Sequence, residues 1–197
     1  MENKLENLEN SKTDLERPQI TEIKQVVKTK LFNIEAVSLV FSNGEIREFE
    51  RFKEWEPGVV LMVPMLDHDT LLLTQEYAAG INDYTLSFPK GRIELGEDCL
   101  YAANRELQEE IKYKSNRLSY LQAMTSSPNY SATQMHVVLA EALEPSALEG
   151  DEPEPISVIP WSLQEIPSLL ARRDFHEARS IAALFLVKEF LNKRLYG

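Results

Sequence analysis

The sequence predicts an α+β protein in which a mixed β-sheet lies between helices, with a small antiparallel sheet ahead of it. Three observations support this fold class. Apolar runs of strand length recur along the chain, helical periodicity is confined to a few stretches, and strands and helices do not alternate strictly. With 197 residues, the chain can form one sizeable core and a short appended sheet.

The N-terminal third predicts a tail followed by the small sheet. Residues 1–16 are polar and carry few large aliphatic side chains, so we expect a disordered tail. Residues 17–55 have strand patterns, and Ser42-Asn43-Gly44 between two of them signals a tight turn. We therefore assign residues 17–55 to an N-terminal antiparallel sheet and residues 56–197 to the main domain.

The main domain begins with apolar core strands. Residues 59–66 and 70–77 indicate a second hairpin, which turns around Asp67, His68 and Asp69. Two further strands are expected at residues 118–125 and 134–143, and another at 156–161, after an exposed acidic loop at 149–155.

The C-terminal part predicts two helices. Ser162 suits the cap of a short helix that Pro167 interrupts, and a long helix follows over residues 175–195. Its apolar periodicity runs through Ile181, Leu184, Phe185 and Leu191.

Residues 91–113, GRIELGEDCLYAANRELQEEIKY, carry the clearest chemical signal in the chain. Asp98 suits a helix N-cap. Apolar residues then recur at three- and four-residue spacing, which predicts a helix that buries Leu100, Ala103, Leu107 and Ile111.

A second face of this helix collects acidic side chains. At roughly 100° per residue, Glu106, Glu109 and Glu110 lie within one turn of one another, with Arg105 beside Glu109. Such carboxylates repel one another, and an acidic helix face is usually only solvated. A divalent cation between them would remove the repulsion, and Mg²⁺ suits oxygen ligands that share the ion with a phosphate. Glu97, on the turn before the helix, could reach the same cation.

These residues resemble the Nudix box, G-x5-E-x7-R-E-U-x-E-E-x-G-U, in which U is a bulky apolar residue. The matching positions are Gly91, Glu97, Arg105, Glu106, Leu107, Glu109 and Glu110. Lys112 replaces the last glycine, which ends the helix in that family. The departure therefore concerns the end of the helix rather than the cation ligands.

Beyond the box, the chain resembles the ADP-ribose branch of the Nudix hydrolases, and within it the NudE type. The segments that carry this resemblance are FSNGEIREFER, QEYAAG, Ser127-Pro128, LEGDEPEP and EARSIAALFLVKEFL. The resemblance implies a Nudix αβα sandwich and a homodimer whose N-terminal sheets exchange. It also implies Mg²⁺-dependent, or Mn²⁺-dependent, cleavage of the pyrophosphate in ADP-linked compounds, with release of AMP. ADP-ribose, diadenosine polyphosphates and NADH remain open as substrates.

The resemblance assigns the metal-binding roles. Glu106 and Glu110 are the expected metal ligands, completed by Glu109 and Glu97. Arg105 is expected to orient these carboxylates.

It also points to a base and to substrate contacts. Related ADP-ribose enzymes use a glutamate of the loop that matches residues 149–155, and we expect Glu154, with Glu152 as the second candidate; the alternative is a solvated turn. Either Arg51, which ends the N-terminal hairpin, or Tyr77, which follows a core strand, is expected to contact substrate. The alternatives are an ordinary surface charge and a core aromatic residue.

Composition limits the partners. A net charge of −11 argues against nucleic acid or an anionic membrane as the main partner. The resemblance implies a small nucleoside diphosphate derivative as the partner. The single cysteine, Cys99, rules out an internal disulfide, and no apolar run approaches a membrane span, so we expect a cytoplasmic protein. A Nudix-like module that senses a nucleotide without cutting it is the alternative function, but three metal-bridging carboxylates favour an enzyme.

Overall fold

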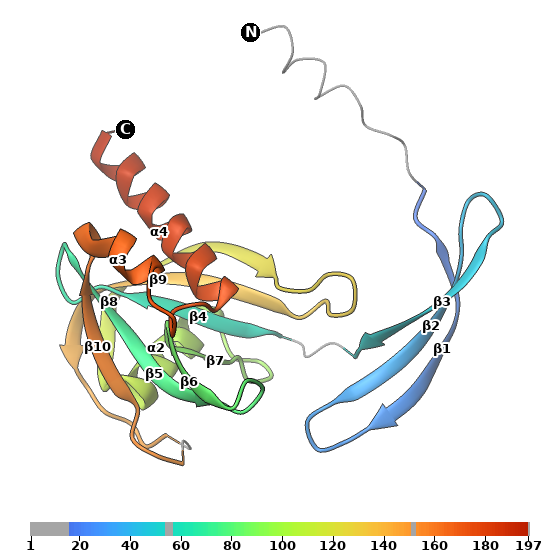
Figure 1. Ribbon diagram of the computed structural model, residues 1–197, viewed down its shortest axis with the longest axis horizontal. Coiled ribbons are helices and arrows are strands. Elements are labelled where there is room, and N and C mark those ends of the chain that lie inside the picture. Colours follow the sequence, from blue (N-terminus) through green and yellow to red (C-terminus); the bar gives the residue numbers. More distant parts are fainter. Residues whose placement is uncertain (1–15, 54–56, 151–152, 197) are drawn as a thin grey trace, which may run out of the picture. The chain divides into compact units, whose positions relative to one another are not determined.

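The structure is a computed structural model that describes residues 16–53, 57–150 and 153–196 (Figure 1). The chain divides into two compact units. The N-terminal unit comprises the described residues of Met1–Lys53 together with Asn129–Ser131, and the C-terminal unit comprises the others. The expected tail and the expected junction at residues 55 and 56 lie almost entirely outside the described residues.

The N-terminal unit is a three-stranded antiparallel sheet, as predicted from the sequence. Its strands are β1 (Gln19–Lys28), β2 (Asn33–Val40) and β3 (Ile46–Phe52). Gly44 has a φ of 83°, in the left-handed region that glycine tolerates, and its N–H donates to the Phe41 carbonyl at 2.9 Å. This turn joins β2 to β3 at the predicted Asn-Gly site.

Many large apolar side chains of this small sheet are exposed. They include Ile20, Ile23, Val26, Ile46 and Phe49. A sheet of three strands needs a covered apolar face to be stable. The described residues therefore leave an apolar surface on the N-terminal unit.

The C-terminal unit contains two sheets. A mixed sheet has the order β7-β4-β9-β8, with β4 parallel to β9, and a second, antiparallel sheet has the order β10-β5-β6. The strands are β4 (Val59–Pro64), β5 (Thr70–Ala78), β6 (Asp83–Ser87), β7 (Lys90–Arg92), β8 (Tyr113–Thr125), β9 (Gln134–Pro145) and β10 (Ser157–Ser162).

The second predicted hairpin is wrong, although both of its strands exist. β4 and β5 lie in different sheets; just beyond β4, Met65 forms an isolated bridge with Leu71, and the Leu66 N–H donates to the Thr70 carbonyl at 2.8 Å. Both edges of β4 are taken by strands from farther along the chain, β7 and β9. The apolar runs marked the strands correctly, but their pairing is decided by these distant partners.

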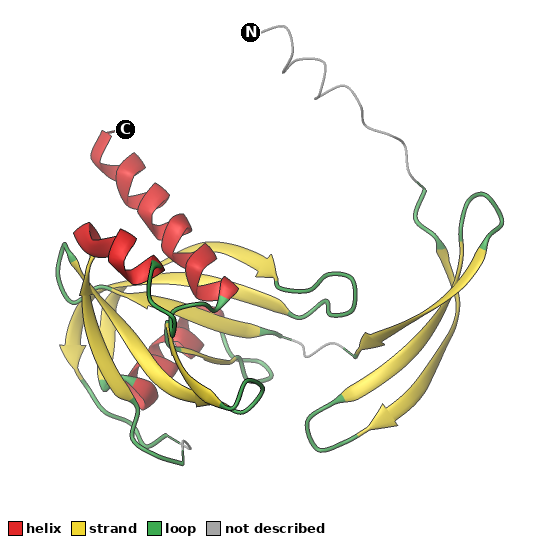
Figure 2. Ribbon diagram, in the orientation of Figure 1, coloured by secondary structure: helices red, strands yellow, loops and turns green. Residues whose placement is uncertain are grey.

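Helices cover both sides of the mixed sheet (Figure 2). They are α2 (Cys99–Glu110), the short 3-10 helix η2 (Leu163–Glu165), α3 (Ile166–Leu170) and α4 (Ala178–Tyr196). Successive side chains of a strand point to opposite faces, so Val60 and Met62 pack with α2, whereas Leu61 and Val63 pack with α3 and α4. This αβα arrangement agrees with the predicted fold class.

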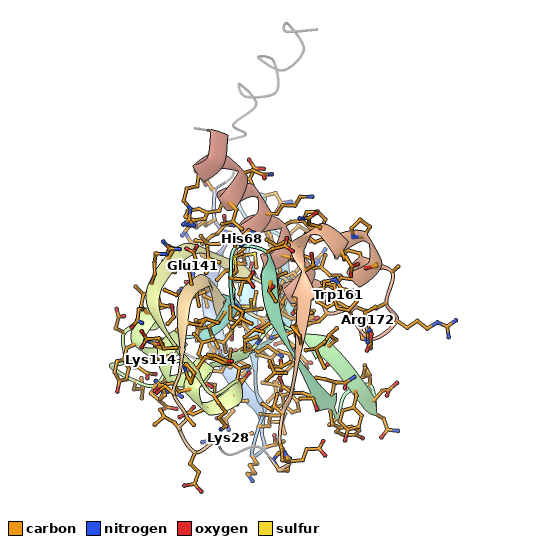
Figure 3. The ribbon with its side chains drawn as sticks, turned by 90° about the vertical axis from the view of Figure 1, so that its left-hand side faces the viewer. Lys28, His68, Lys114, Glu141, Trp161 and Arg172 are labelled. Carbon is orange, nitrogen blue, oxygen red and sulfur yellow. The ribbon has the colours of Figure 1, made fainter. Side chains whose placement is uncertain are left out.

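The C-terminal helices follow the prediction except at Pro167, which does not interrupt a helix, and at Phe185, which is not buried. Ser162 caps η2 by accepting a hydrogen bond from the Gln164 N–H, and α3 continues with Pro167 in its first turn, where proline is tolerated. Phe185, expected in the buried stripe of α4, is 50% exposed, and Val187 is buried instead. After α3, the Arg172 guanidinium lies over the Trp161 ring, 5.4 Å from its centroid (Figure 3).

None of the helices in the described parts of the chain is both long and apolar enough to cross a membrane.

Candidate active site

The acidic residues of interest lie on α2 and on the turn before it. The Asp98 carboxylate accepts from the N–H groups of Leu100 and Tyr101 and so caps the helix. Ala103, Leu107 and Ile111 are buried against the sheet, as the periodicity predicts, whereas Leu100, also expected to be buried, is only partly so because it lies in the first turn. Burial of this face fixes the rotation of α2 about its axis and thereby the direction of its glutamates.

Arg105 is the centre of the acidic cluster. Its guanidinium donates two hydrogen bonds to Glu97, at 2.8 and 3.0 Å, and single ones to Glu106 at 2.8 Å and Glu109 at 2.9 Å. A further bond to the Arg92 carbonyl, at 2.8 Å, connects the cluster to β7. Hydrogen bonding by Arg105 holds the pKa of Glu97 below its ordinary value, and Glu97 in turn raises the pKa of Arg105.

Gly91 provides the space that Glu106 occupies. A Cβ atom at residue 91 would overlap the Glu106 carboxylate itself. Because Gly91 is paired with Val60 in the sheet, its backbone cannot move aside without breaking that pairing. The absence of a side chain at residue 91 therefore sets the position of the Glu106 carboxylate.

Glu110 differs from its neighbours because it is buried. Only 6% of the residue is exposed, and its carboxylate accepts from the Lys90 N–H at 3.3 and 3.4 Å. Burial raises the pKa of Glu110 well above its ordinary value, and the nearby carboxylate of Glu76 raises it further. Two carboxylates in such surroundings are stabilised when a cation joins them.

A cavity of about 770 Å³ connects these groups. Its lining consists of Glu76, Lys90, Gly91, Arg92, Glu94, Arg105, Glu106, Glu109, Glu110, Glu149 and Gly150. Hard divalent cations prefer carboxylate oxygens, which this lining supplies in excess. One of them, Oε1 of Glu76, is buried and has no hydrogen-bond partner among the described residues. The residues therefore fit a divalent cation.

The carboxylates are gathered on Arg105 rather than around a preformed metal cage. Within the described parts of the chain, no three acidic, histidine or cysteine side chains stand at metal-ligand spacing. Three of the four expected ligands, Glu97, Glu106 and Glu109, instead bind Arg105. The fourth, Glu110, lies beside Lys90.

Described residues of the acidic loop line a cavity together with the C-terminal end of α2. Glu154 is exposed and accepts a hydrogen bond from the Tyr84 hydroxyl at 2.7 Å. It lines a second cavity, of about 490 Å³, together with Glu109, Glu110 and Lys112. Gly150 lines both cavities. The second candidate base, Glu152, lies outside the described residues.

The two expected substrate contacts lie in different units. Tyr77, on β5, is half exposed; its hydroxyl donates to Asn82 at 2.5 Å, and its ring packs edge-on against Tyr84. Arg51, on β3, donates to Glu35 at 3.3 Å. It lines a pocket of about 230 Å³ in the N-terminal unit, with Ile34, Glu50, Phe52 and Tyr130.

Two residues at the site were not singled out from the sequence. Glu76 gives no signal because a lone glutamate near the end of a strand resembles a surface residue. Tyr84 gives none because its partner Glu154 is 70 residues away. Glu76 lay in a predicted strand and Tyr84 in none, and only the fold brings Glu76 to the first cavity and Tyr84 to Glu154.

Comparisons with known proteins agree with this geometry. Residues 18–51 match the NudE-type Nudix hydrolase N-terminal domain, and residues 56–184 match the NUDIX domain. The ADP compounds hydrolase NudE of Escherichia coli is 44% identical over 177 residues, which cover 90% of this chain and 95% of that protein.

Two further similarities point the same way. The ADP-ribose pyrophosphatase of Bacillus subtilis is 27% identical over 164 residues, covering 81% of this chain and 86% of the relative. A crystal structure of ADP compounds hydrolase superimposes with a TM-score of 0.87 at 42% identity, covering 91% of this chain and 97% of the other.

Proposed function

Because this chain belongs to the Nudix hydrolases, we propose that it hydrolyses the pyrophosphate of ADP-linked compounds and releases AMP and a phosphorylated second product. The names of its relatives support ADP-ribose and other ADP compounds as the substrate class. The observation that carries the proposal is the polar cavity in which Arg105 collects three glutamates beside the buried Glu110.

Glu106, Glu109, Glu110 and Glu97 are the proposed ligands of Mg²⁺, or of Mn²⁺ in its place. When bound, the cation would neutralise the pyrophosphate oxygens and polarise the attacking water. Arg105 keeps the helix carboxylates pointing into the cavity and takes up their charge in the absence of the ion. Glu76 supplies an additional carboxylate at the buried end of the cavity.

Glu154 is the proposed general base. In the reaction, the water oxygen forms a bond to one phosphorus, the bridging P–O bond on the opposite side breaks, and the water proton passes to the Glu154 carboxylate. Tyr84 holds that carboxylate at 2.7 Å and restricts its rotamers. Pro153 and Pro155 limit the backbone on either side, so little entropy is lost when the loop closes.

Arg51 and Tyr77 are the proposed substrate contacts. The pocket around Arg51 combines the aromatic rings of Phe52 and Tyr130, whose centroids are 6.0 Å apart, with the Arg51–Glu35 ion pair. Stacking surfaces next to hydrogen-bonding groups suit a purine base. Tyr77 offers a half-exposed ring on the unit that carries the metal site.

A homodimer with exchanged N-terminal sheets would cover the exposed apolar side chains of β1 and β3. Sedimentation equilibrium would test this assembly, and a monomer at micromolar concentration would contradict it. A cytoplasmic location is supported by the single cysteine, Cys99.

A rate panel on ADP-ribose, diadenosine polyphosphates and NADH, with and without Mg²⁺, tests the function. We expect AMP release that requires the metal. A sensing module would bind these nucleotides without releasing AMP, and this result would refute the enzyme assignment.

A further inference from the structure

We infer that Lys112 is a positioning residue that fastens residues 146–148, which lead into the acidic loop, to the last turn of α2 beside the proposed active site. The inference rests on the proposed function, since it concerns turnover at that site. It goes beyond it because Lys112 occupies the one box position at which this chain departs from the family pattern.

The backbone at Lys112 has a conformation that favours glycine. Its φ is 63°, in the left-handed region, directly after the C-cap residue Ile111. The chain thus leaves the helix as a glycine would allow, but with a lysine that is strained there. A strained residue is retained when its side chain provides something that glycine lacks.

The Lys112 ammonium connects two segments. Nζ donates to the Glu109 carbonyl at 2.6 Å and to the Leu148 carbonyl at 2.8 Å. The first of these satisfies a carbonyl in the last turn of α2, where a positive charge also opposes the helix dipole. The second bond crosses to the loop that follows β9.

Backbone bonds complete the same attachment. The Lys112 carbonyl accepts from the Ser146 N–H at 3.0 Å, and the Gln108 carbonyl accepts from the Leu148 N–H at 3.1 Å. The Ser146 hydroxyl donates to the Gln108 side chain at 2.8 Å. Residues 146–148 are therefore docked on the last turn of α2, and only Lys112 contributes a charge to the attachment among these contacts.

The docked residues lead directly into the active site. Glu149, the residue after Leu148, lines the cavity of the metal-binding glutamates, and Gly150 lines both cavities. Glu154 and Lys112 also line the second cavity. Fixing the Leu148 carbonyl therefore fixes the entry of the loop that carries the proposed base.

The test compares Lys112→Gly and Lys112→Arg with the wild type. Glycine keeps the left-handed backbone and removes the ammonium, whereas arginine keeps a cation. We expect Lys112→Gly to lower kcat by about 10- to 100-fold, as small misplacements of catalytic groups do, with an unfolding temperature no lower than that of the wild type. Lys112→Arg should retain most of the turnover.

A second measurement follows the loop directly. Hydrogen exchange of the peptide spanning residues 146–150 should become faster in Lys112→Gly, because the Leu148 N–H is then held less well. Lys114→Met is the matched control (Figure 3), since Lys114 lies two residues away and forms only an exposed ion pair with Glu144, at 3.3 Å, among the recorded salt bridges. It should change neither kcat nor exchange.

Wild-type turnover in Lys112→Gly, with or without faster exchange, would overturn the inference. So would an equal loss of turnover in Lys112→Gly and Lys112→Arg, because the cation would then not matter. A wild-type protein that released no AMP would refute the proposed function instead, and faster exchange in Lys112→Gly would still report on the attachment.

Discussion

Replacement of Gly91 by alanine should separate activity from folding. The new Cβ would occupy the place of the Glu106 carboxylate, which must then move. Gly91 has no left-handed φ, so alanine can adopt its backbone conformation without strain. The added methyl group thus displaces one proposed metal ligand, Glu106, without straining the backbone at residue 91.

The size of the effect follows from the overlap. Non-bonded carbon atoms approach to about 3.5 Å, so the Glu106 carboxylate has to move by at least about 1 Å. A misplacement of this size can cost on the order of 10² in rate. The free energy of unfolding should change by no more than about 1 kcal/mol, because alanine also reduces the freedom of the unfolded chain.

The assay is the initial rate of AMP release at saturating Mg²⁺, together with thermal unfolding and a Mn²⁺ titration followed by electron paramagnetic resonance. We expect slower turnover, weaker Mn²⁺ binding and an almost unchanged unfolding temperature. Gly80→Ala is the control, since a Cβ there meets no atom within 4 Å. Wild-type turnover and Mn²⁺ affinity in folded Gly91→Ala would refute the assigned role of Glu106.

Five other variants test the remaining roles. Glu110→Gln should keep the fold and lose activity by on the order of 10² or more, because it removes a ligand charge at constant volume; near-normal turnover at saturating Mg²⁺ would contradict the assignment. The same variant tests the pH dependence of the metal-free protein. The raised pKa of Glu110 contributes stability that is fully present below its ordinary 4.5 and is lost progressively as pH rises to the folded-state pKa of about 9. Wild-type stability should therefore fall relative to Glu110→Gln across this range, by at most about 1.4 kcal/mol per pH unit in chemical denaturation. Mg²⁺ should reverse this loss. Glu154→Gln should lower kcat by roughly 10² to 10⁴ with Mg²⁺ affinity unchanged, and Glu152→Gln should not; the opposite pattern would move the base to Glu152. Arg51→Ala or Tyr77→Ala should raise the KM for ADP-ribose, and an unchanged KM in both would remove them from the substrate site.

The catalytic helix could be predicted in detail because its determinants are local. Asp98 caps it, and the spacing of Ala103, Leu107 and Ile111 fixes its buried face. The direction of Glu106, Glu109 and Glu110 follows from that face by helix geometry alone. For this element, a few neighbouring residues specify both structure and site.

The parts that could not be predicted depend on distant segments. The false hairpin of β4 and β5 has the same sequence pattern as a true one, and only competition from β7 and β9 excludes it. Glu76 shares its cavity with residues of β7 and α2, and Tyr84 meets Glu154 because β6 and β10 both pair with β5 in one sheet. The hydrogen bond from Lys112 to the Leu148 carbonyl is likewise not evident from the sequence, since its partner lies 36 residues away.

The alanines on the buried face of α2 have a mechanical consequence. Ala102 and Ala103 are fully buried against Val60, Met62 and the neighbouring strand β9. Because their side chains are single methyl groups, they let the helix backbone approach the sheet closely, and that spacing sets the position of Glu106, Glu109 and Glu110 relative to β7. A larger side chain in place of either alanine would increase the distance between α2 and the sheet. It would thereby shift all carboxylates of the helix together relative to Gly91. Two small residues buried against the sheet therefore determine how the helix carboxylates are placed.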